Sequence, residues 1–420
     1  MPSLWFLLLA ASQAAAPVTL DEALAAAREA NARLPVAAMD VKVTEEQVRS
    51  ARGQLLPKLG VQSDLQIAPR HFGYSSSGSA VGEERLQLMA SESLYAGGAL
   101  RAGVAGAEAQ VRASMAAYRI AEKALDLEVR TRFSEVLKGE DGVQLRAEGL
   151  ARLRSYLLTI RQRQAAGEGL QTDVLKTEAR LASEEADAED AARQLRKAEM
   201  ELADLLGRDP EEPVAVVPLP PPEPPTPLAE TRWQQVPELL QGAAQIAAAE
   251  ARAESALAGR RPRVDLTADA GLLGPGFAVG LPAGGLSQRL RDDLGASLTL
   301  SFSWPLFDFG VYRGEVGQAR ARAEQARRQV VVLSREARLR FGQAREDSAR
   351  WYRETELRKK ALPLARDAYL SAESLYRGGS GTTLNVLDSF GNLIGASQSY
   401  ADAVFSYRVA QAAAIRWGTP

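Results

Sequence analysis

The strongest constraint on the fold is an internal repeat. Gly167 in the first half of the chain corresponds to Gly379 in the second half, at an offset of 212 positions (379 − 167). Pro57 corresponds to Pro262 at an offset of 205 positions (262 − 57), so seven extra residues fall in a loop of the second half. A regular offset of this kind indicates two copies of one structural unit.

Each copy contains a long helical hairpin. The predicted hairpins cover about 99–206, with a turn at 166–169, and about 312–417, with a turn at 378–381. The first arm of the first hairpin contains no proline and would extend about 100 Å at 1.5 Å per residue. We expect Pro363 to interrupt the matching arm of the second hairpin, because proline removes a helical hydrogen bond. Helices of this length are typical of a coiled coil or a helical conduit.

Two strands precede each hairpin, and they are predicted at about 58–69, 85–95, 263–271 and 294–304. In the last strand, small hydroxyl residues alternate with large apolar residues, which are Leu298, Leu300, Phe302 and Trp304. A period of two predicts a strand with two unlike faces. The pattern fits a half-buried strand in a soluble core, and it also fits a membrane strand whose apolar face contacts lipid. Glu92 falls on the apolar side of the second strand, so it would have to lie near the rim of a bilayer.

The remaining segments give the domain organisation. Residues 1–16 have the short apolar run and small residues of a signal peptide, although they include no Lys or Arg. No other run approaches the ~20 apolar residues of a membrane helix. We divide the rest into a first repeat (17–207), an extended proline-rich linker (208–227) and a second repeat (228–420).

The first repeat is predicted to begin with two helices. Thr19 and Glu22 have the spacing of a capping box at the start of the first helix. Pro35 is expected to separate this short helix from a longer one.

The composition argues against most kinds of chemistry. Lys and Arg number 51 and Asp and Glu number 53, so no basic surplus indicates a nucleic-acid partner. The chain has no cysteine, which excludes a disulfide and a lipid-modified cysteine. Its one histidine, His71, falls in a Gly/Ser-rich loop, where we expect it to be solvated. We therefore expect no enzyme activity, no metal site and no cofactor.

Several short motifs follow one another along the chain. They are Leu20-Asp21-Glu22-Ala23-Leu24, Leu55-Leu56-Pro57-Lys58-Leu59, Pro305-Leu306-Phe307-Asp308-Phe309-Gly310 with the weaker Ser93-Leu94-Tyr95-Ala96-Gly97-Gly98, Arg163-Gln164-Ala165-Ala166-Gly167 with Thr172-Asp173-Val174-Leu175, and Leu375-Tyr376-Arg377-Gly378-Gly379 with Asn385-Val386-Leu387-Asp388. In their order and spacing, these motifs resemble those of TolC-family outer-membrane channel proteins, and the resemblance covers essentially the whole chain after the signal segment. No single motif is specific, but their duplicated order is.

The resemblance implies a mostly helical fold with a membrane β-barrel. Each chain would contribute four strands to a trimeric barrel of ~12 strands, which a periplasmic coiled-coil tube of helices continues. Closure is a physical requirement, because four strands alone would leave unpaired backbone groups in lipid. Leu298, Leu300, Phe302 and Trp304 would then face lipid. Aromatic residues at the ends of the strands would form a girdle at the inner rim of the barrel, namely Trp304, Tyr95, Phe307 and Phe309. For Phe307 and Phe309 the alternative is plain packing where strand meets helix.

The resemblance also implies roles for residues at the two turns. The periplasmic tips that contact an adaptor protein would consist of Ala166, Gly167, Glu168, Gly378, Gly379 and Ser380. The alternative is that the glycines only supply left-handed turn conformations.

Two further sets follow from the same resemblance. Asn385 and Asp388 occupy the positions of an acidic pore constriction, with an amide in place of one carboxylate, unless Asp388 is an ordinary solvated residue. Thr172, Asp173 and Tyr376 match part of a polar clasp that holds the tips shut. Gly381 stands where that clasp has an arginine, so we expect a weaker clasp.

The implied function is the outer-membrane exit duct of a tripartite efflux or type I secretion system in a Gram-negative bacterium. A homotrimer would passively conduct substrate from an inner-membrane pump and a periplasmic adaptor to the exterior, and small-molecule efflux is favoured. The expected partners also include outer-membrane lipid but no nucleic acid, and the chain would not be a lipoprotein. The alternative is a periplasmic coiled-coil adaptor or scaffold protein, which would need a single hairpin and globular β-domains.

Overall fold

The computed structural model describes residues 17–69, 80–225, 235–275 and 294–417. The expected signal peptide and His71 lie outside the described residues. Contacts divide the chain into two units. The strand unit comprises Ala37–Tyr118 and Pro237–Leu333, and the helical unit comprises Met1–Val36, Arg119–Val236 and Ser334–Pro420. Both units contain segments of both repeats. Across the described ranges, none of the helices combines the length and the apolar character needed to cross a membrane.

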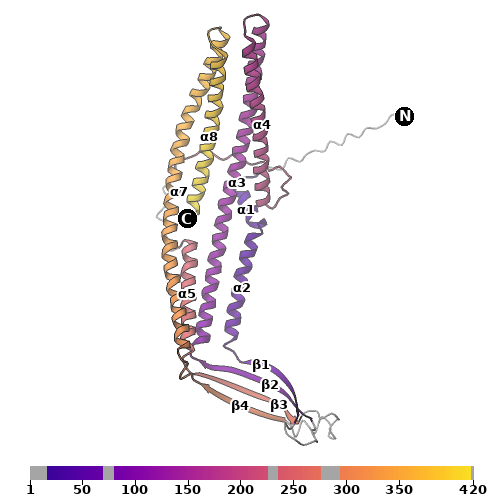
Figure 1. Cartoon of the computed structure of the whole chain (residues 1–420), viewed down its shortest axis with the longest axis vertical. Coiled ribbons are helices and arrows are strands. Elements are labelled where there is room, and N and C mark those ends of the chain that lie inside the picture. Colours follow the sequence, from indigo (N-terminus) through magenta and orange to yellow (C-terminus); the bar gives the residue numbers. More distant parts are fainter. Residues whose placement is uncertain (1–16, 70–79, 226–234, 276–293, 418–420) are drawn as a thin grey trace, which may run out of the picture. The chain divides into compact units, whose positions relative to one another are not determined.

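The strand unit contains one antiparallel sheet in the order β1-β2-β3-β4 (Figure 1). Its strands are β1 (Lys58–Pro69), β2 (Ala80–Ala96), β3 (Arg263–Pro275) and β4 (Leu294–Ser303). β2 begins five residues earlier than predicted and β3 ends four residues later, because backbone pairing continues beyond the alternating side chains. The central pair, β2 and β3, joins the two repeats into one sheet.

In each repeat, a shorter helix packs against the first part of a long one. α2 (Arg33–Gly53) contacts α3 (Ala99–Ala165) through Thr44 and Ser114, whose hydroxyl oxygens are 2.8 Å apart. α5 (Pro237–Ala258) contacts α7 (Val311–Arg377) at Gly242, where an added Cβ would lie 2.6 Å from the side chain of Val330. The repeat therefore extends from the sequence to the packing of the strand unit.

The long helices have matching lengths in the two repeats (Figure 1). α3 and α7 each contain 67 residues. α4 (Gln171–Leu205) and α8 (Thr383–Trp417) each contain 35 residues. The predicted fold of two copies of helix, two strands and a long helical hairpin is therefore confirmed.

The effects of two prolines differ from the prediction. α7 is not interrupted and continues through Pro363, which lies on an exposed side of the helix where water can reach the carbonyl group that loses its partner. The predicted short helix followed by a longer one is present as α1 (Leu20–Ala30) and α2, but the break comes before Pro35. Pro35 lies in the first turn of α2, where backbone N–H groups have no helical partner in any case. The capping box of Thr19 and Glu22 is confirmed.

A hydrophobic core joins α3, α4, α7 and α8 near the two turns. We call it the tip core, and it consists of Leu153, Tyr156, Leu157, Ile160, Val174, Tyr369, Tyr376, Val386, Phe390, Leu393 and Ile394. The rings of Tyr156 and Tyr376 meet edge to face, with centroids 5.3 Å apart. This contact connects the first hairpin to the second within one chain.

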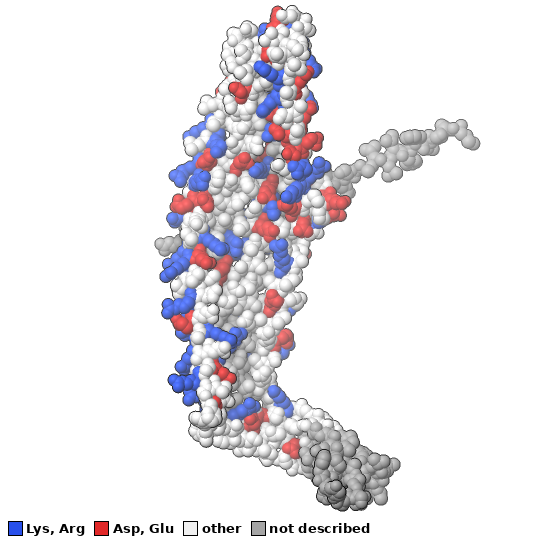
Figure 2. Space-filling model, viewed as in Figure 1, with Lys and Arg blue, Asp and Glu red and all other residues white. Residues whose placement is uncertain are grey.

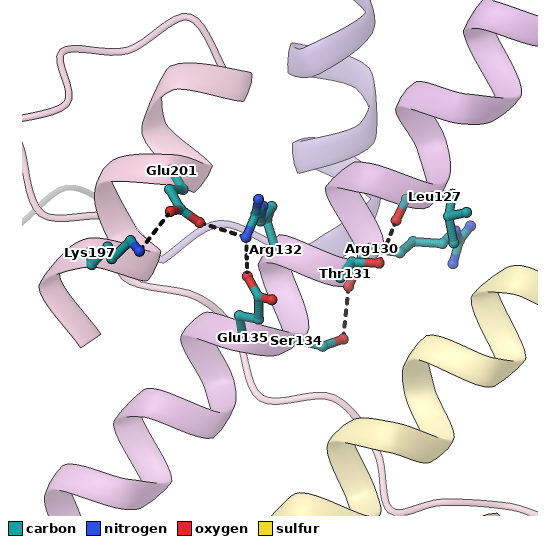
Figure 3. Close-up of polar contacts among 8 residues, drawn as sticks. All are labelled: Leu127, Arg130, Thr131, Arg132, Ser134, Glu135, Lys197 and Glu201. Atoms are coloured by element: carbon teal, nitrogen blue, oxygen red, sulfur yellow. Dashed lines mark hydrogen bonds and ion pairs between the residues drawn. The ribbon is translucent and has the colours of Figure 1, made fainter. Parts of the chain in front are cut away.

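Ion pairs join α3 to α4 along the first hairpin. Figure 3 shows one of them, in which Arg132 contacts Glu201 at 2.6 Å and Glu135 at 2.7 Å, while Lys197 approaches Glu201 at 3.8 Å. Further pairs toward the turn join Arg146 to Glu184 (2.8 Å), Arg154 to Glu185 (2.8 Å) and Arg161 to Glu178 (2.6 Å). The spacing of these pairs along both helices is that of an antiparallel coiled coil.

The proline-rich linker packs on the helical unit over its described part, 208–225. Val18 bridges Val216 in parallel, and both Val214 and Val216 are buried. The hydroxyl group of Tyr407 in α8 donates a hydrogen bond to the carbonyl oxygen of Glu223 at 2.6 Å. The linker is extended, as its prolines require, but it lies against the helices.

Candidate functional site

The two turns have the same backbone structure. Gly167 and Gly379 have positive φ angles of 76° and 78°. In the first turn, Glu168 N–H donates to Arg163 O and Gly167 N–H donates to Gln164 O. The second turn has the same pair of bonds 212 residues further on (379 − 167), where Ser380 N–H donates to Leu375 O and Gly379 N–H donates to Tyr376 O. These two bonds form a Schellman motif, which requires a left-handed residue and so favours glycine. The predicted tip residues are thus brought together in two equivalent turns.

A second glycine in each turn approaches the end of the preceding helix. A Cβ on Gly169 would lie 3.0 Å from the backbone nitrogen of Gln164, and a Cβ on Gly381 would lie 2.7 Å from that of Tyr376. Gly381 therefore cannot be treated simply as a position that has lost an arginine. Its equivalence to Gly169 shows that this turn has no room for a side chain there.

An arginine that the sequence analysis did not single out lies between the two turns. Arg163, in the last turn of α3, donates a hydrogen bond to the carbonyl oxygen of Tyr376, and its guanidinium lies 5.2 Å from the centre of the Tyr376 ring. Glu168 lies 3.7 Å from Arg163. A cation at the C-terminal end of a helix interacts favourably with the helix dipole. The position of Arg163 in the last turn of α3 was the sequence signal that could have identified it.

The predicted clasp residues lie in different surroundings. Tyr376 is buried in the tip core, whereas Thr172 is exposed and Asp173 is half-buried at the start of α4. Burial raises the pKa of the neighbouring Tyr156 hydroxyl, and the negative charge of Asp173 adds to the rise. Tyr376 therefore serves first as a packing residue that holds the two hairpins of one chain together.

The predicted constriction residues share one face of α8. Asn385 and Asp388 are three residues apart, and both are exposed near the start of the helix. Their side chains are thus available for contact with solvent or with another chain.

The register of the sheet places apolar residues on one face. Leu300 is opposite Leu266, Phe302 is opposite Val264, and both pairs lie on the same side of the sheet because successive residues alternate. The other face is polar, with Thr299 opposite Thr267 and Ser301 opposite Asp265, and the hydroxyl group of Ser297 bonds Asp269 at 2.8 Å. The alternation predicted for one strand therefore extends across its neighbour.

Both faces of β4 are exposed in the single chain. Leu298, Leu300, Phe302 and Trp304 have exposed fractions of 72%, 65%, 67% and 52%. The indole N–H of Trp304 donates to the carbonyl oxygen of Arg260 at 3.3 Å, just beyond the end of the strand. Glu92 is opposite Leu266, three residues from the first residue of β3, and so lies near the helical end of the apolar face.

The joint between β4 and α7 contains an exposed aromatic pair. Phe307 and Phe309 meet edge to face at 4.5 Å and are 76% and 90% exposed, so neither is packed at the joint within the chain. Phe309 has a φ of 52°, which is strained for a residue with a side chain. The equivalent residue of the first repeat is Gly97, with a φ of 63°. This strain could not be read from the sequence motif.

Comparison with known families gives a match over both repeats. The family model of the outer membrane efflux protein matches residues 23–208 and 229–415. No curated protein matches the chain at the level of sequence.

Several solved structures share the fold. A membrane protein from Pseudomonas aeruginosa is 22% identical, with a TM-score of 0.82 over 95% of this chain and 93% of that one. The outer membrane protein VceC from Vibrio cholerae is 18% identical, with a TM-score of 0.80 over 95% of both chains. CusC, whose crystal structures are described in terms of folding and transmembrane channel formation, is 17% identical, with a TM-score of 0.85 over 96% of this chain and 92% of that one. With a family match across both repeats and the same two-repeat fold, this chain belongs to the outer membrane efflux protein family.

Proposed function

We propose that the chain forms the passive outer-membrane exit duct of a tripartite export system in a Gram-negative bacterium. Three copies close their strands into one barrel in the membrane, and their helices continue it as a periplasmic tube. Substrate enters from an inner-membrane pump through a periplasmic adaptor. The duct itself needs no catalytic group or cofactor, because the pump supplies the energy.

The observation that carries this proposal is the sheet with one apolar and one polar face, both exposed in the single chain. In a closed barrel the apolar face contacts lipid and the polar face lines a water-filled lumen. Closure also pairs the outer edges of β1 and β4, which would otherwise expose backbone groups to lipid. A soluble adaptor would bury the apolar face against its own core, and the described residues of this chain place no such layer on Leu298 or Leu300.

Two substitutions on neighbouring residues test the proposal. Leu300→Asp puts a charge on the lipid face, and we expect it to abolish assembly in the outer membrane. Thr299→Asp puts the same charge on the lumen face, and we expect normal assembly with altered single-channel conductance. Equal tolerance of both substitutions, or recovery of the unmodified protein in the soluble fraction, would contradict the proposal.

We propose that the turns contact the adaptor, since Ala166, Gly167, Glu168, Gly378, Gly379 and Ser380 form two equivalent exposed turns. Glu168→Arg should reduce export in cells while leaving trimer assembly and channel conductance intact. Glu346→Arg, which changes an exposed charge on α7 far from the turns, serves as the control. Loss of export in both variants would point to a general effect of charge reversal.

We propose that Asn385 and Asp388 line the narrowest part of the duct, because they share an exposed face near the tip of α8. A ring of three Asp388 carboxylates would favour cations. In planar bilayers, Asp388→Asn should lower the cation selectivity and Asn385→Asp should raise it. Unchanged reversal potentials in both variants would place the constriction elsewhere.

We propose small molecules as the substrates in preference to secreted proteins. The support is the family description as an efflux protein. A deletion strain should gain sensitivity to small toxic compounds and should secrete its proteins normally. The reverse phenotype would favour type I secretion.

A further inference from the structure

The two repeats provide an internal comparison of equivalent positions. Residues 212 positions apart are equivalent throughout α3 and α7 (311 − 99) and throughout α4 and α8 (383 − 171), because the paired helices have equal lengths. A difference between two equivalent positions therefore marks a local feature that only one repeat has.

One such difference concerns an ion pair between the two arms of a hairpin. In the first repeat, Arg154 of α3 pairs with Glu185 of α4 at 2.8 Å. The equivalent residues of the second repeat are Arg366 of α7 (366 − 154) and Ser397 of α8 (397 − 185). The arginine is retained, but a serine replaces its carboxylate partner. Arg366 therefore lacks the counter-charge that its equivalent has.

Arg366 has no substitute partner in the part of the chain that the structure describes. There, no hydrogen bond, ion pair or ring contact engages its exposed side chain. The residues three and four positions away on α7 carry no charge, and the adjacent Asp367 points in a different direction from the helix. Figure 2 shows basic and acidic side chains interspersed over the helices on the visible face, and many arginines there form ion pairs, such as Arg358 with Glu354. An arginine without an acidic partner is thus an exception.

A pocket is present at the position of the missing pair. It has a volume of about 310 Å³, and both Arg366 and Ser397 line it. Its lining residues come from α3, α7 and α8 of the helical unit, so one chain forms the pocket without a second copy. A pocket of this size can admit a small organic molecule beside the unpaired guanidinium.

The inner part of the pocket is apolar. Leu393 and Ile394 of α8 belong to the tip core and are buried, and Gly149 of α3 lies beside them. Leu145 and Leu362 add two partly buried leucines from α3 and α7. This surface favours the apolar body of a ligand, because contact with it removes apolar area from water.

The outer part of the pocket has a surplus of positive charge. Arg152 and Arg366 both line it, and Glu148 is the one acidic side chain among the described residues that do so. Glu148 lies 3.5 Å from Arg152 and offsets that charge. The charge of Arg366 remains, so the pocket favours a ligand with an anionic group.

Pro363 also lines this pocket. A proline is unfavourable inside a helix, and the equivalent residue of the first repeat is Ala151 (363 − 212). In the pocket, the proline ring adds a rigid apolar surface next to Leu362. The pocket thus gives Pro363 a role that the helix alone does not.

We propose that this pocket binds a small amphipathic organic anion. The carboxylate of the ligand takes the place that Glu185 has in the first repeat and accepts hydrogen bonds from Arg366. Its apolar body packs on Leu393 and Ile394. A planar guanidinium suits a carboxylate, because the two groups can form parallel hydrogen bonds. The site lies within one chain and does not depend on what the duct exports.

Equilibrium dialysis with naphthoate, an aromatic carboxylate, tests the site in the purified protein, with protein-free detergent as the blank. We expect one saturable site per chain. Arg366→Gln removes the cation, and Ser397→Glu restores the ion pair of the first repeat, so each should weaken binding by about tenfold or more. Gln411→Glu is the control, because it adds the same charge at an exposed position of α8 outside the pocket. It should change binding by less than about twofold.

Two further probes test the class of ligand. Naphthylmethanol has the same ring without the charge, and inorganic phosphate has charge without the ring. Both should bind about tenfold more weakly than naphthoate, because each lacks one of the two contacts. Binding of either probe as tight as that of naphthoate would overturn the amphipathic anion as the ligand.

The proposal would also be overturned if naphthoate showed no saturable binding, or if Arg366→Gln bound it as tightly as the natural chain does. Helical circular dichroism of each variant shows whether the fold is kept. Arg366→Gln changes an exposed side chain, so it decides the outcome if Ser397→Glu does not fold. Failure of this test would leave the proposed duct unaffected, since the pocket and the strands lie in different units.

Discussion

The buried glutamate of α4 offers a direct test of how the helical unit is held together. Glu184 is 1% exposed, and its carboxylate lies 2.8 Å from Arg146 of α3 and 2.7 Å from Arg180. Arg146 also donates to Gln398 of α8 at 3.3 Å. One carboxylate therefore organises contacts among three helices. We predict that Glu184→Gln destabilises the helical unit, because it leaves two guanidinium groups without their shared counter-charge.

The expected cost follows from the burial of the partners. Removing one member of a buried ion pair costs about 3–5 kcal/mol. Here the cost should be smaller, at about 2–3 kcal/mol, because the two arginine charges that remain keep a partner or contact with water. Arg146 keeps Asp187 at 3.1 Å, and the side chain of Arg180 is 37% exposed to water.

The adjacent residue provides a matched control. Glu185 also pairs with an arginine of α3, Arg154, at the same distance of 2.8 Å, but both side chains are exposed. Exposed pairs contribute about 0–1 kcal/mol, so Glu185→Gln should have little effect. The assay is denaturant unfolding in detergent, followed by helical circular dichroism, with unfolding rates compared if refolding fails. A cost for Glu185→Gln equal to or above that for Glu184→Gln would refute the reasoning.

Three further predictions concern a strained residue, a partly buried acid and a turn. Phe309→Gly should relieve the left-handed strain and raise the free energy of unfolding by up to about 1 kcal/mol. The loss of an exposed ring should also weaken lipid binding. A lower free energy of unfolding would contradict the strain at this position. Burial raises the pKa of Glu199 above its reference value of 4.5, so the folded chain holds that proton more tightly. Stability therefore falls as the pH rises from about 4.5 through the folded pKa, and Glu199→Gln should be more stable than the natural chain at neutral pH in thermal melts. Gly381→Ala should cost about 1–3 kcal/mol because its Cβ would meet Tyr376, whereas Gly378→Ala, with its nearest neighbour at 3.5 Å, should cost little.

The sequence contained most of the information about the fold. The repeat and the alternating strands predicted two hairpins and four strands, since both patterns reflect local periodicity and turn chemistry. The predicted interruption at Pro363 was wrong because the effect of a proline depends on which side of α7 it faces, and that side is set by packing. The extra length of β2 and β3 could not be predicted from the side-chain pattern, because backbone pairing does not require alternating side chains.

The candidate site was less accessible from the sequence. The glycines of the turns were identified because a left-handed turn favours that residue. Arg163 was missed because its partner is a backbone carbonyl group in the other repeat, and no local pattern indicates such a contact. The steric demand at Gly381 was missed for a related reason, since the close approach to Tyr376 exists only in the folded turn.

The central claim is that one face of β4 contacts lipid and the other contacts water. Spin labels attached to single cysteines at Thr299, Leu300, Ser301 and Phe302 in proteoliposomes measure this directly, because the natural chain has no competing thiol. We predict that labels at 300 and 302 are accessible to oxygen in the lipid and that labels at 299 and 301 are accessible to a water-soluble nickel complex. Equal exposure of all four labels to water, or lipid contact at only one of 300 and 302, would contradict the account.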